Sequence, residues 1–436
     1  QKEQFDDIII PSPKDIKAYL DQHVIGQHNT KEIISVAVSK HFRRLANPVI
    51  DGIEIERYYH FHCISDSGFL RTLEELGISD KMHWVETKMG YFHQGKVSKW
   101  GNPFALLFFP GLSLVAKFRY GLHAFLSTKR NKWDDLDKID AQSWIKKWVG
   151  KEAYKVLWEK LFEYKFYEFS NNLSAAWIWS RIRRIGRSRY NIFREKLGYL
   201  EGGSQTLLNK MKEYIEENGG EIHLKSPVSK VAIENSAVKG VELADKFIEF
   251  DKVISTIPIP YIAKIMPDLP QEIIKKFEAV DNIAVVCVIA KLKKSVTENF
   301  WLNVNDENMD IPGLVEYSNL KPMDDKIVYA PFYMPFENPK FKESDEIFIE
   351  KVKEYLKTIN TKLTDDDFLA IRASRYRYSQ PICPPGFLED LPDFDLPVKG
   401  LWAADTCYYY PEDRGISESI DFGTKMAEDA IDGGKK

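Results

Sequence analysis

Cysteine is scarce in this sequence, and the cysteines present are far apart. The 436 residues include only Cys63, Cys287, Cys383 and Cys407, and no C-x-x-C pair occurs. This spacing argues against a zinc ribbon and against a small disulfide-stabilised domain. We therefore expect no metal site and a reducing, cytoplasmic setting.

Glycine is present in ordinary number but lacks the spacing that dinucleotide-binding folds use. The chain has 24 glycines, and no two are separated by a single residue, so G-x-G-x-x-G is absent. Without it, a strand-to-helix turn lacks the open backbone amides that hold a pyrophosphate. A near match to a phosphate loop, from Gly90 to Val97, ends without the hydroxyl that binds magnesium. Side-chain alternation around Gln94-Gly95 predicts a β-hairpin there instead.

The sequence also lacks an uninterrupted hydrophobic run long enough to span a bilayer. The most apolar stretch, Phe104 to Leu126, is broken by Pro110-Gly111 and carries Lys117 and Arg119. A span needs about 20 apolar residues. We predict two buried helices that flank a turn. The alternative is an interfacial amphipathic segment, which would give the protein a peripheral membrane contact.

No excess of positive charge is present, since 61 basic residues face 65 acidic ones. This balance argues against nucleic-acid binding by the whole chain. The stretch Gln1 to Ile10 is charged and has no apolar signal core, and we expect the chain to be a fragment or a processed product.

The 44% of hydrophobic residues can fill the cores of two or three globular domains. Eight of the ten tryptophans fall between Trp84 and Trp179, and a helical block is predicted from about Trp133 to Arg189. Helices are also predicted within 13–46 and over 207–218 and 417–431, and strands over 221–224, 228–234, 238–243, 247–250, 252–256 and 400–404. Three of these strands should form a small antiparallel ribbon.

Three clusters upstream of residue 205 permit two interpretations each. The His60-Phe61-His62-Cys63 segment is typical of a structural strand, although its alternate side chains share a face that could hold a metal. The basic residues Arg181, Arg183, Arg184, Arg187 and Arg189 indicate a solvated helix face with carboxylate partners, or an anion-binding surface. The glycine-rich segment 198–204 is either a helix-entry turn or an anion site at a helix N-terminus.

The C-terminal segment carries the most suggestive pattern. A strand over 401–404 runs into Asp405, and a loop through Asp413 and Arg414 reaches Gly415 at the start of a helix. Asp405 could accept hydrogen bonds from ligand hydroxyls, and the amides after Gly415 could stabilise negative charge.

From about Asp51 onward the chain resembles the flavin-dependent amine oxidase superfamily, most closely its protoporphyrinogen-oxidase-like and phytoene-desaturase-like FAD oxidoreductases. The matching pieces, in family order, are 52–60, 198–203, 222–228, 251–258 and 400–415. This resemblance implies an α/β plus α+β fold, with a Rossmann-like FAD domain and an inserted mixed helical and β substrate domain. It also implies hydride abstraction from a C–C or C–N bond by the flavin, so no catalytic side chain is assigned.

The resemblance also implies cofactor-binding roles. Val228 would hold the adenine end through its backbone, Thr256 and Pro258 would line the dinucleotide crevice, and Asp405 would meet the ribityl-pyrophosphate region. Arg414, Gly415, Ile416 and Ser417 would lie at the flavin end. Ala404 departs from the glycine that relatives often carry.

The N-terminal segment of the chain resembles another family. Residues 11–27 and 36–45 are similar to the start of the AAA+ module of the ClpX unfoldases, in which the segment matching Val24 to Gln27 packs around adenine. The Walker motifs are absent, so a ClpP-type partner is not expected. The chain is thus interpreted as chimeric or truncated, with a junction between about Leu45 and Glu54 and without the first βαβ unit of the FAD domain.

These observations predict three parts: a ClpX-like helical segment (1–49), an FAD-binding domain (50–95, 196–260 and 396–436) and a substrate domain (96–195 and 261–395). The expected function is FAD-dependent oxidation of a small-molecule substrate, large and apolar in character. FAD retention should be weak, and the chain inactive, because the fingerprint is missing. The alternatives are an ATP-binding Clp fragment and a non-catalytic binding protein on a flavoprotein remnant.

Overall fold

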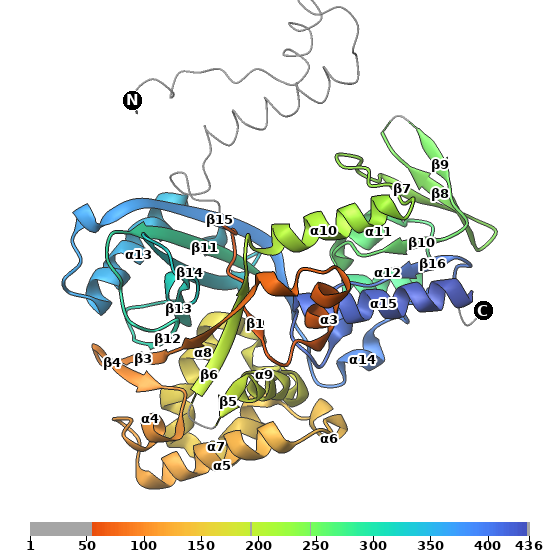
Figure 1. Cartoon of the computed structure of the whole chain (residues 1–436). Helices are drawn as coiled ribbons and strands as arrows, with labels where there is room; N and C mark the ends of the chain where they lie inside the picture. The colour runs from red at the N-terminus through yellow and green to blue at the C-terminus, as the bar shows by residue number, and fades with distance from the viewer. Residues whose placement is uncertain (1–54, 192–193, 245, 434–436) are drawn as a thin grey trace, which may run out of the picture.

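A seven-stranded sheet forms one side of the molecule, on the left in Figure 1, in a computed structural model that describes residues 55–191, 194–244 and 246–433. Its strand order is β15-β11-β14-β13-β12-β3-β4. The strands are β3 (Met89–His93), β4 (Lys96–Trp100), β11 (Asn282–Leu292), β12 (Trp301–Asn305), β13 (Gly313–Glu316), β14 (Lys326–Pro335) and β15 (Phe368–Pro381).

Strand β11 shows how the sequence specifies this sheet. It is a near-continuous apolar run, and 10 of its 11 residues are buried. Val286 and Val288 pack on the side of helix α13 (Asp345–Ile359), in a core with Phe348. Val285 and Cys287 point to the opposite face, into a second core. The two-residue period of a strand therefore gives the sheet two buried faces.

The tryptophan-rich helices pack in that second core, as the predicted helical block requires. They are α5 (Leu114–Lys129), α6 (Asp134–Asp137), α7 (Ala141–Leu157), α8 (Glu159–Phe166) and α9 (Ala175–Arg187), preceded by α4 (Pro103–Leu107). Ser113, Asp140 and Ser174 cap α5, α7 and α9 by accepting hydrogen bonds from backbone N–H groups of the first turn.

The region matched to an FAD domain contains smaller sheets. Strands β10 (Val253–Ser255) and β16 (Leu401–Ala403) form a parallel pair, and β7 (Lys230–Glu234), β8 (Ala237–Glu242) and β9 (Phe247–Glu249) form the predicted antiparallel ribbon. The expected strand over 221–224 is wrong. Residues 221–223 have no regular secondary structure, a turn follows at Leu224 and Lys225, where Lys225 has a φ of 61°, and the segment pairs with no described strand.

A third sheet and four helices complete this side of the molecule. The sheet has the order β1-β6-β2, with β5 beside β6, and comprises β1 (His62–Cys63), β2 (Met82–Thr87), β5 (Arg189–Asn191) and β6 (Arg194–Leu200). The helices are α3 (Ser67–Glu75), α10 (Ser204–Glu217), α15 (Ile416–Asp432) and the short α14 (Phe387–Asp390). Helices α11 (Ile262–Ile265) and α12 (Gln271–Glu278) follow β10.

The β3–β4 hairpin decides one sequence-based question. Gln94 and Gly95 have φ values of 51° and 72°, as a tight hairpin turn requires, so this segment is not a phosphate loop. Since β3 pairs with β12, the domain boundary predicted between residues 95 and 96 falls inside a hairpin that belongs to the seven-stranded sheet.

The ClpX-like segment 1–49 and the helices predicted within 13–46 lie outside the described residues. Within the described part of the chain, no helix is long and apolar enough to cross a membrane. All four cysteines are buried and free, so none of them forms a disulfide.

Candidate functional site

A cavity of about 2270 Å³ lies where the seven-stranded sheet, the tryptophan-rich helices and the ends of β10 and β16 meet. Small-molecule sites commonly measure about 300–1,000 Å³. This cavity is therefore large enough for more than one small ligand. Its wall combines the cofactor-side residues Thr256 and Asp405 with Lys165, Trp301 and Tyr333 from the opposite side.

The parallel pair β10–β16 places two of the predicted segments together. Thr256 follows β10 and Ala404 follows β16, and both line the cavity because the carboxyl ends of parallel strands meet at one edge. Asp405 joins the two segments. Its Oδ2 accepts from the Ile259 N–H at 2.7 Å and its Oδ1 from the Cys407 N–H at 2.8 Å. Both carboxylate oxygens of Asp405 therefore help to fix the loops of this edge.

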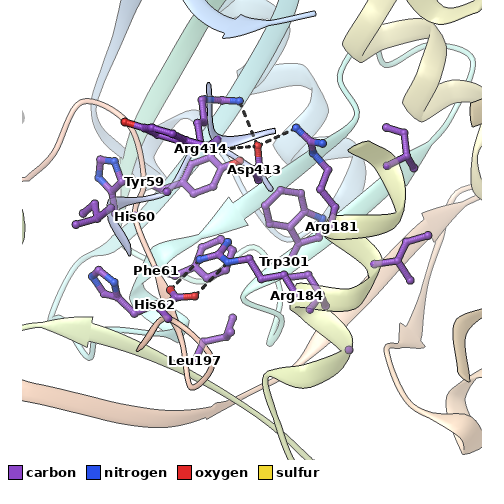
Figure 2. A pocket seen from close by; sticks show the side chains of 18 of the residues that line it. Tyr59, His60, Phe61, His62, Arg181, Arg184, Leu197, Trp301, Asp413 and Arg414 are labelled. Carbon is purple, nitrogen blue, oxygen red and sulfur yellow. Dashed lines mark hydrogen bonds and ion pairs between the residues drawn. The ribbon is translucent and has the colours of Figure 1, made fainter. Parts of the chain in front are cut away.

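A charged cluster lies at the centre of the cavity wall. Asp413 Oδ1 accepts from Arg181 Nη2 at 2.8 Å and from the Arg414 backbone N–H at 2.9 Å, and Figure 2 shows the carboxylate between the two arginines. Burial would raise the pKa of Asp413, but the positive charges of Arg181, Arg414 and Lys165 hold it well below its usual range. The guanidinium of Arg181 also stacks on Trp177, with 4.0 Å between its carbon and the ring centroid.

Lys165, on α8, lines the same part of the cavity. Burial and the positive charges of Arg181 and Arg414 lower its pKa to about 7, against the opposing effect of Asp413. The amine is thus close to half protonated at neutral pH. A lysine in this state can take up or release a proton at Nζ beside a ligand.

Aromatic side chains form the wall on the sheet side. The ring of Tyr59 lies edge-on to Trp301 and Tyr329, with centroids 5.8 and 5.7 Å apart. Tyr59 and Tyr333 share a side-chain hydrogen bond, and burial raises the pKa of Tyr59 well above its usual value. These hydroxyls therefore stay neutral, and the wall presents apolar faces to a ligand (Figure 2).

His60, Phe61 and His62 of the His60–Cys63 segment line the cavity, and no group of three potential metal ligands occurs among the described residues. Only His62 and Cys63 form strand β1, and the His62 ring stacks on Phe69 at 3.8 Å. Burial lowers the pKa of His62 to about 4, which makes it neutral at pH 7. His60 Nδ1 lies 2.5 Å from Glu56 Oε2.

Glu56 decides between the two interpretations of the glycine-rich segment 198–204. Its Oε1 accepts from the Ser204 N–H at 2.7 Å, at the N-terminus of α10. Burial raises the pKa of Glu56, but His60 and the Ser204 bonds outweigh it and lower the value to about 2. The anion at this helix N-terminus is thus a side chain of the protein.

The arginine-rich helix α9 has the predicted carboxylate partners, but the expectation of a solvated face is wrong. Arg181, Arg183 and Arg184 are only 16–24% exposed and pair with Asp413, Glu412 and Asp66. Arg184 holds Asp66 through two hydrogen bonds of 2.9 and 3.2 Å. The run therefore joins α9 to two distant loops.

Six of the eight predicted cofactor-binding residues line the cavity: Thr256, Pro258, Asp405, Arg414, Gly415 and Ile416. The cavity wall does not include Val228, which is 38% exposed in the loop before β7, or Ser417, which is buried and accepts from the Phe69 N–H at 3.3 Å. Their roles toward a cofactor stay predictions.

Sequence reasoning missed Lys165 and the pairing of Arg181 with Asp413. The arginine run and the acidic loop were both visible, but their sequence separation of 232 residues hides the contact. Lys165 carries no local signal, because its altered pKa depends on neighbours from other segments.

The two ends of an FAD molecule fit the described residues unequally. The flavin end fits, since the cavity wall joins the N-terminus of α15 to Arg414 and the aromatic side chains. The pyrophosphate end does not fit, because the glycine fingerprint is absent and β10 pairs with no described strand other than β16.

Space at the N-terminus of α15 is partly occupied by the protein itself. A Cβ added at Gly415 would come within 2.0 Å of Glu418 Oε2, so this carboxyl fills the position beside the glycine. Within the described residues, that oxygen is buried without a hydrogen-bond partner, and burial raises the pKa of Glu418 to about 7.

Solved structures share this fold at low sequence identity. A protein from Exiguobacterium sp. 255-15 assigned to the protoporphyrinogen oxidases superposes with a TM-score of 0.64, at 16% identity over 88% of this chain and 89% of that one. Putrescine oxidase with bound putrescine gives 0.66, at 15% identity over 88% and 90%. An oxidoreductase from Methanosarcina mazei gives 0.62, at 19% identity over 83% and 85%.

Curated relatives match only a short part of the chain. ClpX of Treponema denticola is 34% identical over 73 residues, which is 17% of this chain and 18% of the relative. ClpX 3 of Methylococcus capsulatus is 61% identical over 36 residues, 8% of each. The chain thus spans less than a fifth of the length of these relatives, and the ClpX resemblance is a short partial match.

The family model for flavin-containing amine oxidoreductases matches residues 52–391, which is most of the chain. This match contains four of the five sequence pieces, all but 400–415, and agrees with the superposed structures. The chain belongs to the flavin-containing amine oxidoreductase family.

Proposed function

We propose that this chain binds FAD in the large cavity and oxidises a large, apolar substrate there by hydride loss from a C–C or C–N bond. The observation that carries the proposal is one continuous cavity of about 2270 Å³ that reaches from the ends of β10 and β16 to the aromatic wall. When bound, the flavin would supply the hydride acceptor. Family membership supports the same cofactor class.

The cofactor side would be held by residues at the ends of the two parallel strands. Thr256 and Pro258 would contact the dinucleotide, and Val228 would support the adenine end through its backbone. The amides of Gly415 and Ile416 at the start of α15 would stabilise negative charge on a reduced flavin. Because the pyrophosphate end lacks its glycine turn, we propose weak and reversible binding.

The substrate side would be the aromatic part of the cavity. Tyr59, Trp301 and Tyr333 offer apolar faces and neutral hydroxyls, which suit a large apolar molecule with few polar groups. Lys165 is the residue that would hold or release a proton at Nζ, since its pKa of about 7 allows both states. Arg181 and Asp413 would stay charged in their ion pair while Lys165 changes its protonation state.

The test is a titration of the purified chain with FAD, followed by flavin fluorescence, with ATP as the comparison ligand. Thr256→Glu places a negative charge at the proposed pyrophosphate edge and should weaken FAD binding by about tenfold or more. Thr361→Glu, at an exposed threonine in a loop outside the cavity, is the matched control and should bind as the wild type does.

Binding of ATP but not FAD would contradict the proposal and support the Clp-like alternative. Failure to bind either nucleotide would contradict it in favour of a non-catalytic protein. Equal FAD affinity in Thr256→Glu and Thr361→Glu would show that FAD binds elsewhere.

A further inference from the structure

Helices α4 and α5 expose an unusual amount of large apolar surface. Phe108 is 78% exposed, Leu114 72% and Phe118 70%. We call the set the α4–α5 patch; its members are Phe104, Leu107, Phe108, Leu114, Val115, Phe118, Leu122, Phe125 and Leu126. The expectation of buried helices is therefore wrong, although the two helices and their turn are present as predicted.

The reason is that α5 packs inward through its small and polar residues. Its buried side chains are Ala116, His123 and Ser127. Ser127 accepts from Trp179 Nε1 at 2.9 Å through its carbonyl, and the His123 ring lies 4.6 Å from Trp144. With the inner face satisfied in this way, the apolar stripe at helical spacing is left outside.

Charge sets this region apart from the rest of the protein. Between Lys88 and Trp133 the sequence contains eight lysines and arginines and no aspartate or glutamate, whereas the whole chain has a net charge of −4. Lys96, Lys99, Lys129 and Lys132 are exposed. A large apolar patch in a basic, acid-free segment is the combination that binds the interface of an anionic membrane.

The patch also borders the large cavity. Phe118, Leu122 and Phe125 line the cavity wall, whereas Phe108, Leu114 and Val115 do not and face outward. Both helices lie at the lower edge of the molecule in Figure 1, away from α10 and α15. A surface that binds at this edge would therefore meet one end of the cavity.

Helix α5 is held firmly in this position. Arg119 donates from Nε to the Trp148 carbonyl at 2.8 Å and from Nη2 to the Lys147 carbonyl at 2.6 Å. Ser113, the N-cap of α5, donates from its backbone N–H and its hydroxyl to Glu152. These bonds to α7 keep the apolar stripe outside without a change of fold.

We propose that the α4–α5 patch docks the protein on an anionic lipid bilayer, with α5 in the plane of the interface and the cavity open toward the lipid. Phe108 and Val115 insert among the acyl chains, and the surrounding lysines contact the lipid phosphates. No helix needs to cross the membrane for this attachment, and the docking does not depend on FAD.

The test is flotation of the full chain with vesicles of phosphatidylcholine alone or with phosphatidylglycerol added. The wild type should float with the anionic vesicles and less so at high salt, because screening weakens the lysine contacts. The double variant Phe108→Glu, Val115→Glu should lose binding by about tenfold or more. Replacement of Lys129 and Lys132 by Gln should reduce the preference for phosphatidylglycerol.

The matched control is the double variant Ile431→Glu, Leu224→Glu. These two apolar side chains are 78% and 70% exposed, as the patch residues are, but they do not belong to the α4–α5 patch. The control should float like the wild type. Wild-type protein that stays unbound, or control and patch variants that lose binding equally, would overturn the proposal. So would a lipid-free dimer that Phe108→Glu, Val115→Glu converts to a monomer, because the patch would then be an interface between two copies.

Discussion

The two sides of the cavity differ in how completely they are built. On the substrate side, the seven-stranded sheet has two buried faces, and the charges of Arg181, Arg183 and Arg184 each meet a carboxylate. On the cofactor side, the described parallel sheet consists of two strands only. Buried side-chain atoms without a hydrogen-bond partner occur on both sides, among them Arg181 Nε, Arg183 Nε and Glu418 Oε2. The contrast teaches that the parallel sheet at the β10–β16 edge is small beside the seven-stranded sheet on the opposite side of the cavity.

The largest effect should come from breaking the substrate-side charge cluster. Asp413→Asn leaves Arg181 and Lys165 without their counter-charge and should lower the free energy of unfolding at pH 7 by about 3–5 kcal/mol. Asp405→Asn, on the cofactor side, keeps one acceptor and should cost about 1 kcal/mol. Urea denaturation of both variants measures the difference.

The effect of pH on these variants follows from the sign of the Asp413 shift. Because its pKa in the folded state lies below the ordinary value of 3.8, the stabilisation is present above pH 3.8 and is lost as the pH falls below that value. The difference between Asp413→Asn and the wild type should therefore shrink in acid. Equal losses for Asp413→Asn and Asp405→Asn would remove the contrast between the two sides.

Glu418 on the cofactor side and Glu316 in the seven-stranded sheet have similar pKa values, and their variants compare the two sides of the cavity. Burial raises the pKa of both Glu418 and Glu316 from 4.5 to about 7. A raised carboxyl pKa stabilises the fold below pH 4.5, and this contribution is lost as the pH rises through 7. Glu418→Gln should therefore stabilise the protein at pH 8 by about 2 kcal/mol, with little change at pH 5.

Glu316 should respond differently, because it accepts from the backbone N–H groups of Val296 at 3.1 Å and Thr297 at 2.8 Å. Glu316→Gln keeps only one acceptor oxygen and should give no gain at pH 8. Thermal unfolding at the two pH values compares the variants. If Glu316→Gln raised the stability at pH 8 and Glu418→Gln left it unchanged, the predicted difference between the two glutamates would be contradicted.

The smallest expected effect concerns Lys165. Its lowered pKa means that the folded protein binds the proton less tightly than the unfolded chain, so stability falls as the pH drops from about 10.5 to about 7 and changes little below that. Lys165→Met removes this penalty, so its gain in the free energy of unfolding over the wild type should be about 1 kcal/mol larger at pH 7 than at pH 8. A difference of the opposite sign would show that the amine is stabilised as a cation.

Much of the cofactor side was predictable because its signals are local. The ends of β10 and β16 and the start of α15 follow from short apolar runs next to Pro258 and Gly415. The β3–β4 hairpin, on the other side in the seven-stranded sheet, follows in the same way from the residues at its turn. The strand predicted over 221–224 failed because β-propensity cannot show whether a partner strand exists.

The substrate side was less predictable, since its chemistry depends on distant residues. The pKa of Lys165 is lowered by burial and by Arg181 and Arg414, against the effect of Asp413, and these neighbours lie in segments other than α8. The exposure of α5 could not be read from its sequence either, because an apolar stripe at helical spacing normally marks the buried face of a helix, whereas here the small and polar face is buried. Only packing against α7 and α9 decides it.

The amount of flavin that stays with the protein tests the central claim most directly. The chain should be purified, loaded with excess FAD, passed through a gel-filtration column, and measured at about 450 nm for bound flavin. Because the glycine fingerprint is absent and the parallel sheet is small, we expect little flavin absorbance after the column. Before the column, FAD should bind reversibly with a dissociation constant above about 1 μM. Stoichiometric flavin after the column would contradict this account.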